Sequence, residues 1–250
     1  MKPNLSYTIW FAQRTGSSLL CKTLEATGIA GKPSEWLAHN PNLLEEYHQT
    51  IHAELQEHLW DIGSTSNGVF GLKHSCYEPH LSQIIEVFRK FPNCPPQEKN
   101  RTKIWELAFP NHRHIFMTRR NKVRLAVSWW KAIQTQEWHR THGESQKYFD
   151  LSDAYSFDAI NHLYMECSMR EAGTQEFFAE GNIIPLTIVY EDLIRDYEHT
   201  IITLLDYLEL DSTTIRISPP YFAQLADEIS EEWVQRFRTE RQVDWVNRGW

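Results

Sequence analysis

The chain has 250 residues, of which 41% are hydrophobic and 23% are charged, and its formal net charge is −8. This length and apolar content fit one domain over residues 1–250 with a sizeable core, and they exclude an intrinsically disordered chain. The negative charge argues against a nucleic-acid partner, because proteins that bind phosphate backbones need clustered lysine and arginine. It is compatible with a small anionic ligand, which a few well-placed arginines can hold.

Four cysteines lie far apart in the sequence, at Cys21, Cys76, Cys94 and Cys167. None has the C-x-x-C spacing of a zinc or redox motif, so we expect neither a metal site nor a disulfide framework. The first residues lack the apolar core of a signal peptide, and no apolar run is long enough to span a bilayer. We therefore expect a soluble cytoplasmic protein without an integral membrane span.

From the N-terminus onward, hydrophobic periodicity predicts strands that alternate with helices. The predicted strands cover residues 5–12, 68–73, 114–118 and 183–189. The predicted helices cover residues 17–27, 42–60, 81–88, 122–138, 157–180, 192–208 and 228–241. We predict a loop that could hold an insertion at residues 92–103 and a mobile polar segment at residues 139–156. The alternation indicates an α/β fold with a P-loop-like central parallel sheet, helices on both faces, and ligands at the carboxyl ends of the strands.

A short polar turn joins the first strand to the first helix, and its residues are Arg14, Thr15, Gly16, Ser17 and Ser18. Such a turn aims successive backbone N–H groups at one point, and the N-terminus of the following helix adds a partial positive charge there. We therefore predict that these five residues bind a phosphate-like anion.

The turn lacks the features of an ATP-binding Walker A loop, G-x-x-x-x-G-K-[ST]. It contains one glycine, no lysine follows that glycine, and no obvious aspartate follows a strand to hold Mg²⁺. A turn with a fixed guanidinium instead suits a less highly charged anhydride that binds without a metal ion. Arg14 can bind such a group through two parallel hydrogen bonds. A P-loop kinase that acts on a small molecule is the alternative.

A second anion site is indicated where the third strand ends. Arg120 closes that strand, and Ser128 follows on the next helix. An arginine and a hydroxyl at this separation can converge on a phosphate at the same edge of the sheet as the first turn. The alternative interpretation is a capped and solvated basic start of a helix.

The two stretches together resemble sulfotransferases that use 3′-phosphoadenosine 5′-phosphosulfate (PAPS), and more narrowly the bacterial trehalose 2-sulfotransferase family. The resemblance rests on Q-R-T-G-S-S-L-L-C from Gln13 and R-N-K-V-R-L-A-V-S-W-W from Arg120. Further matching stretches follow in family order over nearly the whole chain: T-G-I-A-G-K-P-S-E-W-L from Thr27, N-G-V-F-G-L-K from Asn67, Q-T-Q-E-W from Gln134 and E-E-W-V-Q-R-F-R from Glu231.

The resemblance implies a role for each motif. The turn from Arg14 to Ser18 would hold the 5′-phosphosulfate of PAPS, and Arg120 with Ser128 would hold its 3′-phosphate. Glu35 matches the glutamate that is the proposed catalytic base of the family. The acceptor would be a hydroxyl group of a carbohydrate or glycolipid, and the enzyme would be a homodimer.

Two residues at and just after the end of the second predicted strand could also take part in the chemistry. Lys73 could reach the bridging oxygen of the donor, where negative charge develops on the leaving phosphate. His74 is a second candidate for the base, because other sulfotransferases use a histidine in a comparable region.

One segment near the C-terminus departs from the family pattern. The family carries a basic residue just before a Gln-Ala-Asp run, whereas this chain has A-Q-L-A-D at residues 223–227. Gln224 therefore leaves the role of this segment open. It also leaves open a carbohydrate- or nucleotide-binding module that has lost catalysis.

Overall fold

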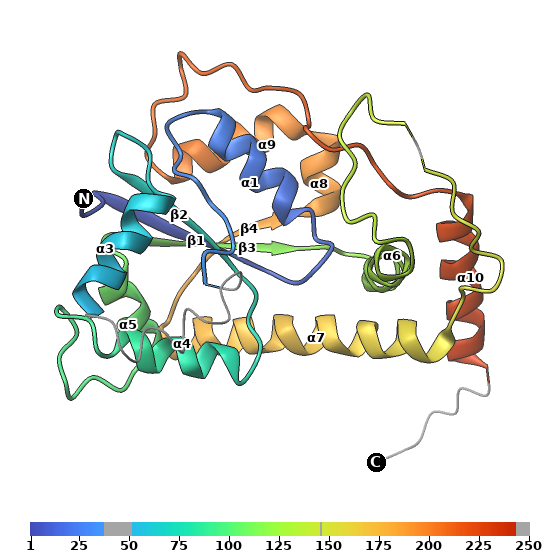
Figure 1. The fold of residues 1–250 in the computed structure, drawn as a ribbon, viewed down its shortest axis with the longest axis horizontal. Helices are drawn as coiled ribbons and strands as arrows, with labels where there is room; N and C mark the ends of the chain where they lie inside the picture. Colours follow the sequence, from blue (N-terminus) through green and yellow to red (C-terminus); the bar gives the residue numbers. More distant parts are fainter. Residues whose placement is uncertain (38–51, 146, 244–250) are drawn as a thin grey trace.

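A computed structural model describes residues 1–37, 52–145 and 147–243 of the chain. Its described part contains a sheet of four parallel strands in the order β2-β1-β3-β4 (Figure 1). These strands are β1 Leu5–Phe11, β2 Val69–His74, β3 His112–Thr118 and β4 Leu186–Val189. Since β1 lies between β2 and β3, the turn that follows β1 emerges in the middle of the carboxyl edge of the sheet.

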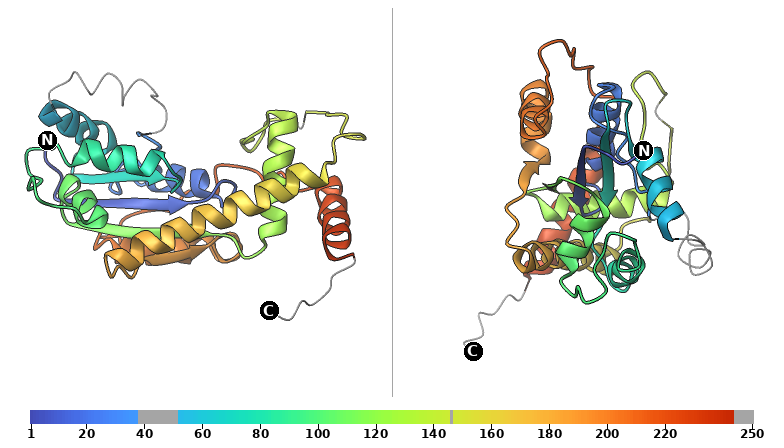
Figure 2. Two further views of the ribbon diagram at one scale, coloured as in Figure 1. Left: turned by 90° about the horizontal axis from the view of Figure 1, so that it is seen from below. Right: turned by 90° about the vertical axis from the view of Figure 1, so that its left-hand side faces the viewer.

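Helices cover both faces of this sheet (Figures 1 and 2). One face is covered by α1 Ser17–Ala26, α8 Tyr190–Arg195 and α9 Tyr197–Tyr207. The other face is covered by α3 His52–Gly63, α4 His80–Phe88, α5 Arg101–Ala108 and part of α7 Phe157–Glu180. Alternate strand residues point to opposite faces, so Ile9 and Ile115 pack on the first layer while Trp10 and Phe116 pack on the second.

A third group of helices lies beyond the carboxyl edge. The long helix α7 runs under the sheet and continues past it, where it packs against α6 Lys122–Thr135 and α10 Glu228–Gln242 (Figure 2). Their shared core contains Trp129, Trp233 and Phe237. This group builds a wall next to the turn that follows β1.

The α/β fold class and most of the predicted elements are confirmed, two helical regions differ from the prediction, and part of one predicted helix is untested. The helix α5 was not predicted; it begins inside the segment expected to be a loop, where Asn100 accepts a hydrogen bond from the N–H of Lys103. The helix predicted at 192–208 is two helices, because Asp196 has the non-helical angles φ −134° and ψ 66°. The first part of the helix predicted at 42–60 lies outside the described residues.

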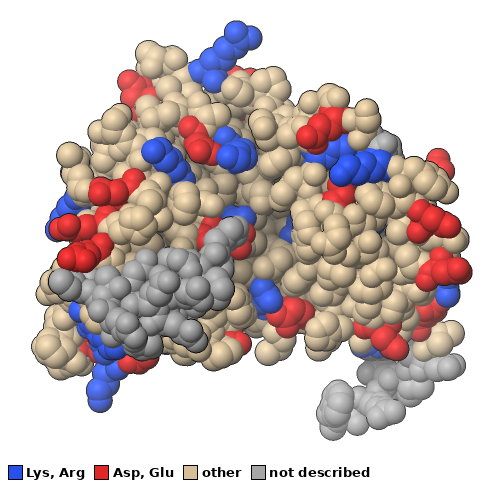
Figure 3. Space-filling view, in the orientation of Figure 1, with Lys and Arg blue, Asp and Glu red and all other residues tan. Residues whose placement is uncertain are grey.

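The surface carries charges of both signs. On the face in Figure 3, acidic and basic side chains are interspersed among uncharged residues. None of the helices within residues 1–37, 52–145 and 147–243 is long and apolar enough to cross a membrane.

Candidate active site

The turn between β1 and α1 has an unusual backbone. Arg14 has a φ of 64° and Gly16 has a φ of 85°, both in the left-handed region. Gly16 is the N-cap of α1, and no described side chain caps the N-terminus of that helix. The hydroxyl of Thr15 donates to the carbonyl of Ala12 at 2.8 Å, which ties the turn to the end of β1. Because the first N–H groups of a helix lack intrahelical partners, the start of α1 can bind an anion.

Arg14 brings together the two motifs that the sequence placed apart. Its Nε donates to Oγ of Ser128 at 3.1 Å, and its Nη1 donates to the carbonyl oxygen of Trp138. Burial, and then the charge of Arg119, lower the pKa of Arg14 to about 10, so the side chain stays a cation at neutral pH. The first turn and Ser128 therefore form one site.

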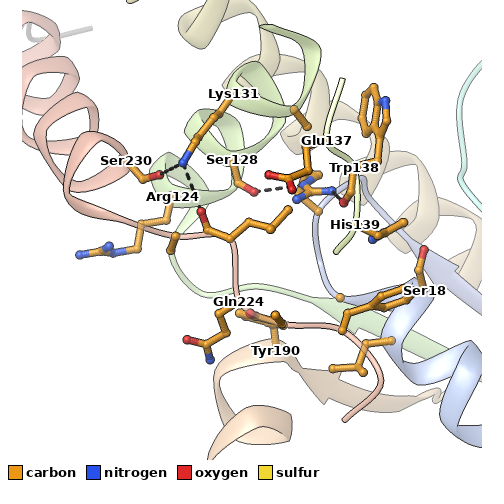
Figure 4. A pocket seen from close by; sticks show the side chains of 18 of the residues that line it. Ser18, Arg124, Ser128, Lys131, Glu137, Trp138, His139, Tyr190, Gln224 and Ser230 are labelled. Carbon is orange, nitrogen blue, oxygen red and sulfur yellow. Dashed lines mark hydrogen bonds between the residues drawn. The ribbon is translucent and has the colours of Figure 1, made fainter. Parts of the chain in front are cut away.

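A cavity of about 450 Å³ lies beside this contact, and we call it the first cavity (Figure 4). Its wall is formed by the start of α1, one face of α6, the start of α8 and residues near 137–142 and 220–226. Its volume lies within the range of small-ligand sites in proteins. Gln224, whose role the sequence left open, lines it together with Ser18 and Tyr190.

One face of α6 presents two cations and a hydroxyl to the first cavity. Arg124, Ser128 and Lys131 all line it, and their spacing of four and three residues places them along one side of a helix (Figure 4). Carboxylates from α10 and the residue before it hold both cations, since Arg124 pairs with Glu231 and Lys131 pairs with Asp227.

The two consecutive arginines after β3 point to different surroundings. Arg119 lines the first cavity, with its guanidinium 4.7 Å from the ring centroid of Tyr190. Arg120 instead forms an ion pair with Asp192, and 58% of its side chain is exposed. The sequence predicted Arg120 beside Ser128, but in the structure Arg120 lies outside the described wall of the cavity and Arg119 is part of it.

Glu35 is held at the carboxyl end of β2 by its neighbour in the chain. Ser34 forms a parallel bridge with Leu72, and its carbonyl oxygen accepts the N–H of Lys73 at 2.9 Å. The Nζ of Lys73 lies 2.7 Å from Oε1 of Glu35 and 3.2 Å from Oγ of Ser18. Only 9% of the Lys73 side chain is exposed. Lys73 therefore connects the first turn to Glu35 through contacts that are largely shielded from water.

Glu35 and Lys73 line a second cavity, of about 320 Å³. The other residues of its wall are Gln13, His74, Ser75, Tyr77, His80 and Arg170. Gln13 lines this second cavity while the next residue, Arg14, lines the first, so the turn after β1 is a wall shared by both.

The sequence model of one family, described as Stf0 sulphotransferase, matches residues 6–240 of the chain. The chain belongs to the Stf0 sulphotransferase family. The match includes the turn after β1, both cavities and the Lys73–Glu35 pair, so these features form the candidate site of a sulfotransferase.

Individual relatives agree with the Stf0 sulphotransferase assignment. The chain is 27% identical to the trehalose 2-sulfotransferase of Mycolicibacterium smegmatis, over 96% of each chain. It is 28% identical to the trehalose 2-sulfotransferase of Mycobacterium tuberculosis, over 94% of each chain. A sulfotransferase from Alicyclobacillus acidocaldarius shares the fold, with a TM-score of 0.50 and 14% identity over 97% of this chain and 94% of that one.

His74, the second candidate for the base of this Stf0 sulphotransferase, is neutral and buried. Its ring packs against two tryptophan rings, with its centroid 5.5 Å from that of Trp10 and 5.3 Å from that of Trp105. Burial, followed by the charges of His80 and Arg170, lowers the pKa of His74 to about 3. An imidazole with so low a pKa and with rings packed against it is a weak proton acceptor.

Several residues of the site were not among the predicted site residues. Arg124 is inside the second motif, but the sequence analysis gave it no role. Arg170 comes from the middle of α7, and its place beside Gln13 depends on how α7 crosses the sheet. No group of three or more His, Cys, Asp or Glu side chains that could hold a metal ion occurs within the described ranges.

Proposed function

We propose that the protein transfers the sulfuryl group of PAPS to a hydroxyl group of a carbohydrate. The acceptor is a free saccharide or the headgroup of a glycolipid, because both offer such hydroxyl groups. Two observations support the proposal. The relatives are named trehalose 2-sulfotransferases. Lys73, in the wall of the second cavity, contacts Ser18, in the wall of the first.

In this proposal the first cavity holds the donor. The N–H groups at the start of α1 and the guanidinium of Arg14 bind the 5′-phosphosulfate. Ser128, with Arg124 and Lys131 on the same face of α6, binds the 3′-phosphate. A cavity with cations at both positions suits a nucleotide with two separate phosphate groups, and a volume of about 450 Å³ accommodates a ligand of that class.

The second cavity holds the acceptor. Glu35 lies in its wall, and its carboxylate can accept the proton of a hydroxyl group that enters there. The proposal rests mainly on two contacts of Lys73. Its ammonium contacts Ser18 on the donor side and Glu35 on the acceptor side. The reacting atoms of two substrates would therefore meet at the Lys73 ammonium.

The reaction balances with these residues alone. The acceptor oxygen forms a bond to sulfur while the bond from sulfur to the bridging phosphate oxygen breaks. The acceptor proton passes to Glu35, and the bond electrons leave with 3′-phosphoadenosine 5′-phosphate (PAP). Lys73 and the N–H groups of α1 stabilise the negative charge that develops on the leaving phosphate. As in phosphoryl transfer, positioning and electrostatic stabilisation supply most of the rate.

Two measurements test this proposal against its rivals. Calorimetric titration should show binding of PAP and much weaker binding of ATP with Mg²⁺, since the turn lacks the Walker lysine. Incubation with PAPS carrying labelled sulfate should then move the label to trehalose. Binding of PAP without transfer to any saccharide or glycolipid would indicate a binding module, and phosphoryl transfer from ATP would indicate a kinase.

A further inference from the structure

Arg170, in the middle of α7, bridges the two chain segments that leave the strands β1 and β2. The last residues paired between these strands are Trp10 and His74. Beyond that pair the strand ladder ends, and side chains have to hold the two segments together. The Nη1 of Arg170 donates to Oε1 of Gln13 at 2.9 Å and to Oγ of Ser75 at 3.2 Å. One guanidinium nitrogen therefore connects the segment after β1 to the segment after β2.

The guanidinium of Arg170 is itself fixed by its surroundings. Its Nε lies 2.7 Å from Oε1 of Glu166, one turn earlier on the same helix, and only 15% of the Arg170 side chain is exposed. Its Cζ lies 4.6 Å from the ring centroid of Tyr77 and 5.4 Å from that of Trp129. A planar group with contacts in several directions has little freedom to rotate. Its hydrogen bonds therefore fix both segments relative to α7.

Gln13 comes directly before a strained residue of the anion-binding turn. Arg14 has a φ of 64°, a left-handed conformation that is unfavourable for a residue with a side chain. Such a conformation persists only where the surrounding structure enforces it. The hydrogen bond from Thr15 to Ala12 holds one side of the turn. On the other side, Arg170 holds the side chain of Gln13. These two contacts fix the backbone from which α1 starts.

Resting on the proposed function, we propose that Arg170 is a positioning residue for sulfuryl transfer, which acts through Gln13 to align the anion-binding turn with the acceptor side of the site. Arg170 itself needs no contact with either substrate. Without its hydrogen bonds the turn relaxes, and the sulfur atom is less well aligned with the attacking oxygen. A misplacement of about 1 Å can cost about 10²-fold in rate. Donor binding depends less on this alignment, because it is spread over many contacts in the first cavity.

The test compares Gln13→Ala, Arg170→Met and the double variant with a matched control. Arg170→Met keeps a long apolar side chain against the two rings but removes the hydrogen-bond donors. Arg236→Met is the control, because Arg236 also pairs with a glutamate four residues away, Glu240, and packs on a tyrosine ring, that of Tyr155. Arg236 lines neither cavity. Labelled-sulfate transfer from PAPS to trehalose gives kcat and the KM for trehalose, and calorimetry gives the Kd for PAP.

We expect Gln13→Ala and Arg170→Met each to lower kcat about 10- to 100-fold. The double variant should lower kcat no further than Arg170→Met alone, because both changes break the same connection. The Kd for PAP and the KM for trehalose should stay within about threefold of the wild-type values, which also shows that the variants are folded. Arg236→Met should match the wild type.

Three results would overturn the inference. Full kcat in Arg170→Met would show that the turn does not need this contact. Losses that multiply in the double variant would show that Arg170 does not act through Gln13. A KM for trehalose that rises in Arg170→Met but not in Gln13→Ala would indicate that Arg170 contacts the acceptor directly.

Amide hydrogen exchange separates this inference from the proposed function. The N–H of Leu20 donates to the carbonyl oxygen of Gly16 at 3.1 Å, so its exchange rate reports on the turn. This rate should rise about 10-fold in Arg170→Met and stay unchanged in Arg236→Met, whether or not sulfate is transferred. If the wild-type protein transfers no sulfate, the proposed function fails and the exchange rate alone decides whether Arg170 holds the turn. An unchanged rate in Arg170→Met would overturn the inference.

Discussion

The ammonium group of Lys73 lies 2.7 Å from the carboxylate of Glu35. The same ammonium is 3.2 Å from the hydroxyl of Ser18, at the start of α1. One shielded side chain thus joins the anion-binding turn to the candidate base. Ser18 lines the first cavity, whereas Lys73 and Glu35 line the second. The two walls touch here because β1 and β2 are neighbours and both end at this edge of the sheet.

Arg124→Gln and Arg120→Gln are a matched pair of variants for the 3′-phosphate site. Arg124 lines the first cavity, whereas Arg120 is paired with Asp192 outside it. Arg124→Gln should weaken PAP binding about 10- to 100-fold, the effect of losing one charge-assisted hydrogen bond. It should change the binding of adenosine 5′-phosphate, which lacks the 3′-phosphate, much less. Arg120→Gln should leave both affinities within about threefold by calorimetry.

The opposite result would support Arg120 as a ligand of the 3′-phosphate, as the sequence suggested. A selective loss of PAP affinity in Arg120→Gln, with Arg124→Gln unaffected, would mean that Arg120 leaves Asp192 to bind the 3′-phosphate. Such a result would remove Arg124 from the donor site.

Gly16→Ala should lower the stability of the protein by straining the turn after β1. Gly28→Ala is the control variant. Both glycines have positive φ, 85° and 72° respectively. A Cβ at Gly16 would lie 2.6 Å from Cδ2 of Tyr190, whereas nothing lies within 4 Å of a Cβ at Gly28. Both variants share a backbone penalty of about 1–2 kcal/mol, and Gly16→Ala should cost about 1–3 kcal/mol more through the clash. Urea unfolding measures the free energy of unfolding of both variants. An equal loss of stability in the two variants would contradict the predicted clash with Tyr190.

The stability of the protein should fall as the pH decreases below about 6.5, because two histidines, one buried and one half-buried, are neutral in the folded protein. Burial lowers the pKa of His74 to about 3 and that of His112 well below its ordinary value. The unfolded chain binds protons at these residues below about pH 6.5, whereas the folded chain does not. Protonation therefore favours unfolding, and each histidine contributes up to about 1.4 kcal/mol of lost stability per pH unit.

The pH dependence can be assigned with one substitution. His112 hydrogen-bonds to the hydroxyls of Ser6 and Thr8, at 3.0 and 2.9 Å, and a glutamine can replace these bonds without titrating. In His112→Gln the free energy of unfolding should change less between pH 7 and pH 5 than in the wild type, by up to about 2 kcal/mol over that interval. An unchanged pH dependence would show that His112 already protonates in the folded state.

The sequence predicted the parallel sheet and the anion-binding turn because their patterns are local. The apolar run of β1, the small residues of the turn and the periodicity of α1 lie within 22 consecutive residues, 5–26. From the sequence, Arg14 and Ser128 could be expected only to lie near the same edge of the sheet. Neither motif specifies the side-chain rotamer that forms the hydrogen bond between them.

The features that could not be predicted depend on contacts between residues that are distant in the sequence. Asp192, 72 positions further on, pairs with Arg120 outside the first cavity, and nothing near Arg120 reveals that partner. Arg170 reaches the second cavity because α7 runs beneath the carboxyl edge, a crossing that helix periodicity does not encode. The short helix α5 was missed because its few apolar residues follow a segment rich in proline and polar residues.

The central claim is that Glu35 accepts the proton of an acceptor hydroxyl while the sulfuryl group passes from PAPS to that oxygen and PAP leaves beside Lys73. The most direct test is the rate of labelled sulfate transfer from PAPS to trehalose by Glu35→Gln, with Glu25→Gln, on the exposed side of α1, as the control. Glu35→Gln should lower kcat about 10²- to 10⁴-fold while the Kd for PAP stays within about twofold, and Glu25→Gln should match the wild type. A Glu35→Gln enzyme with full kcat would contradict the account.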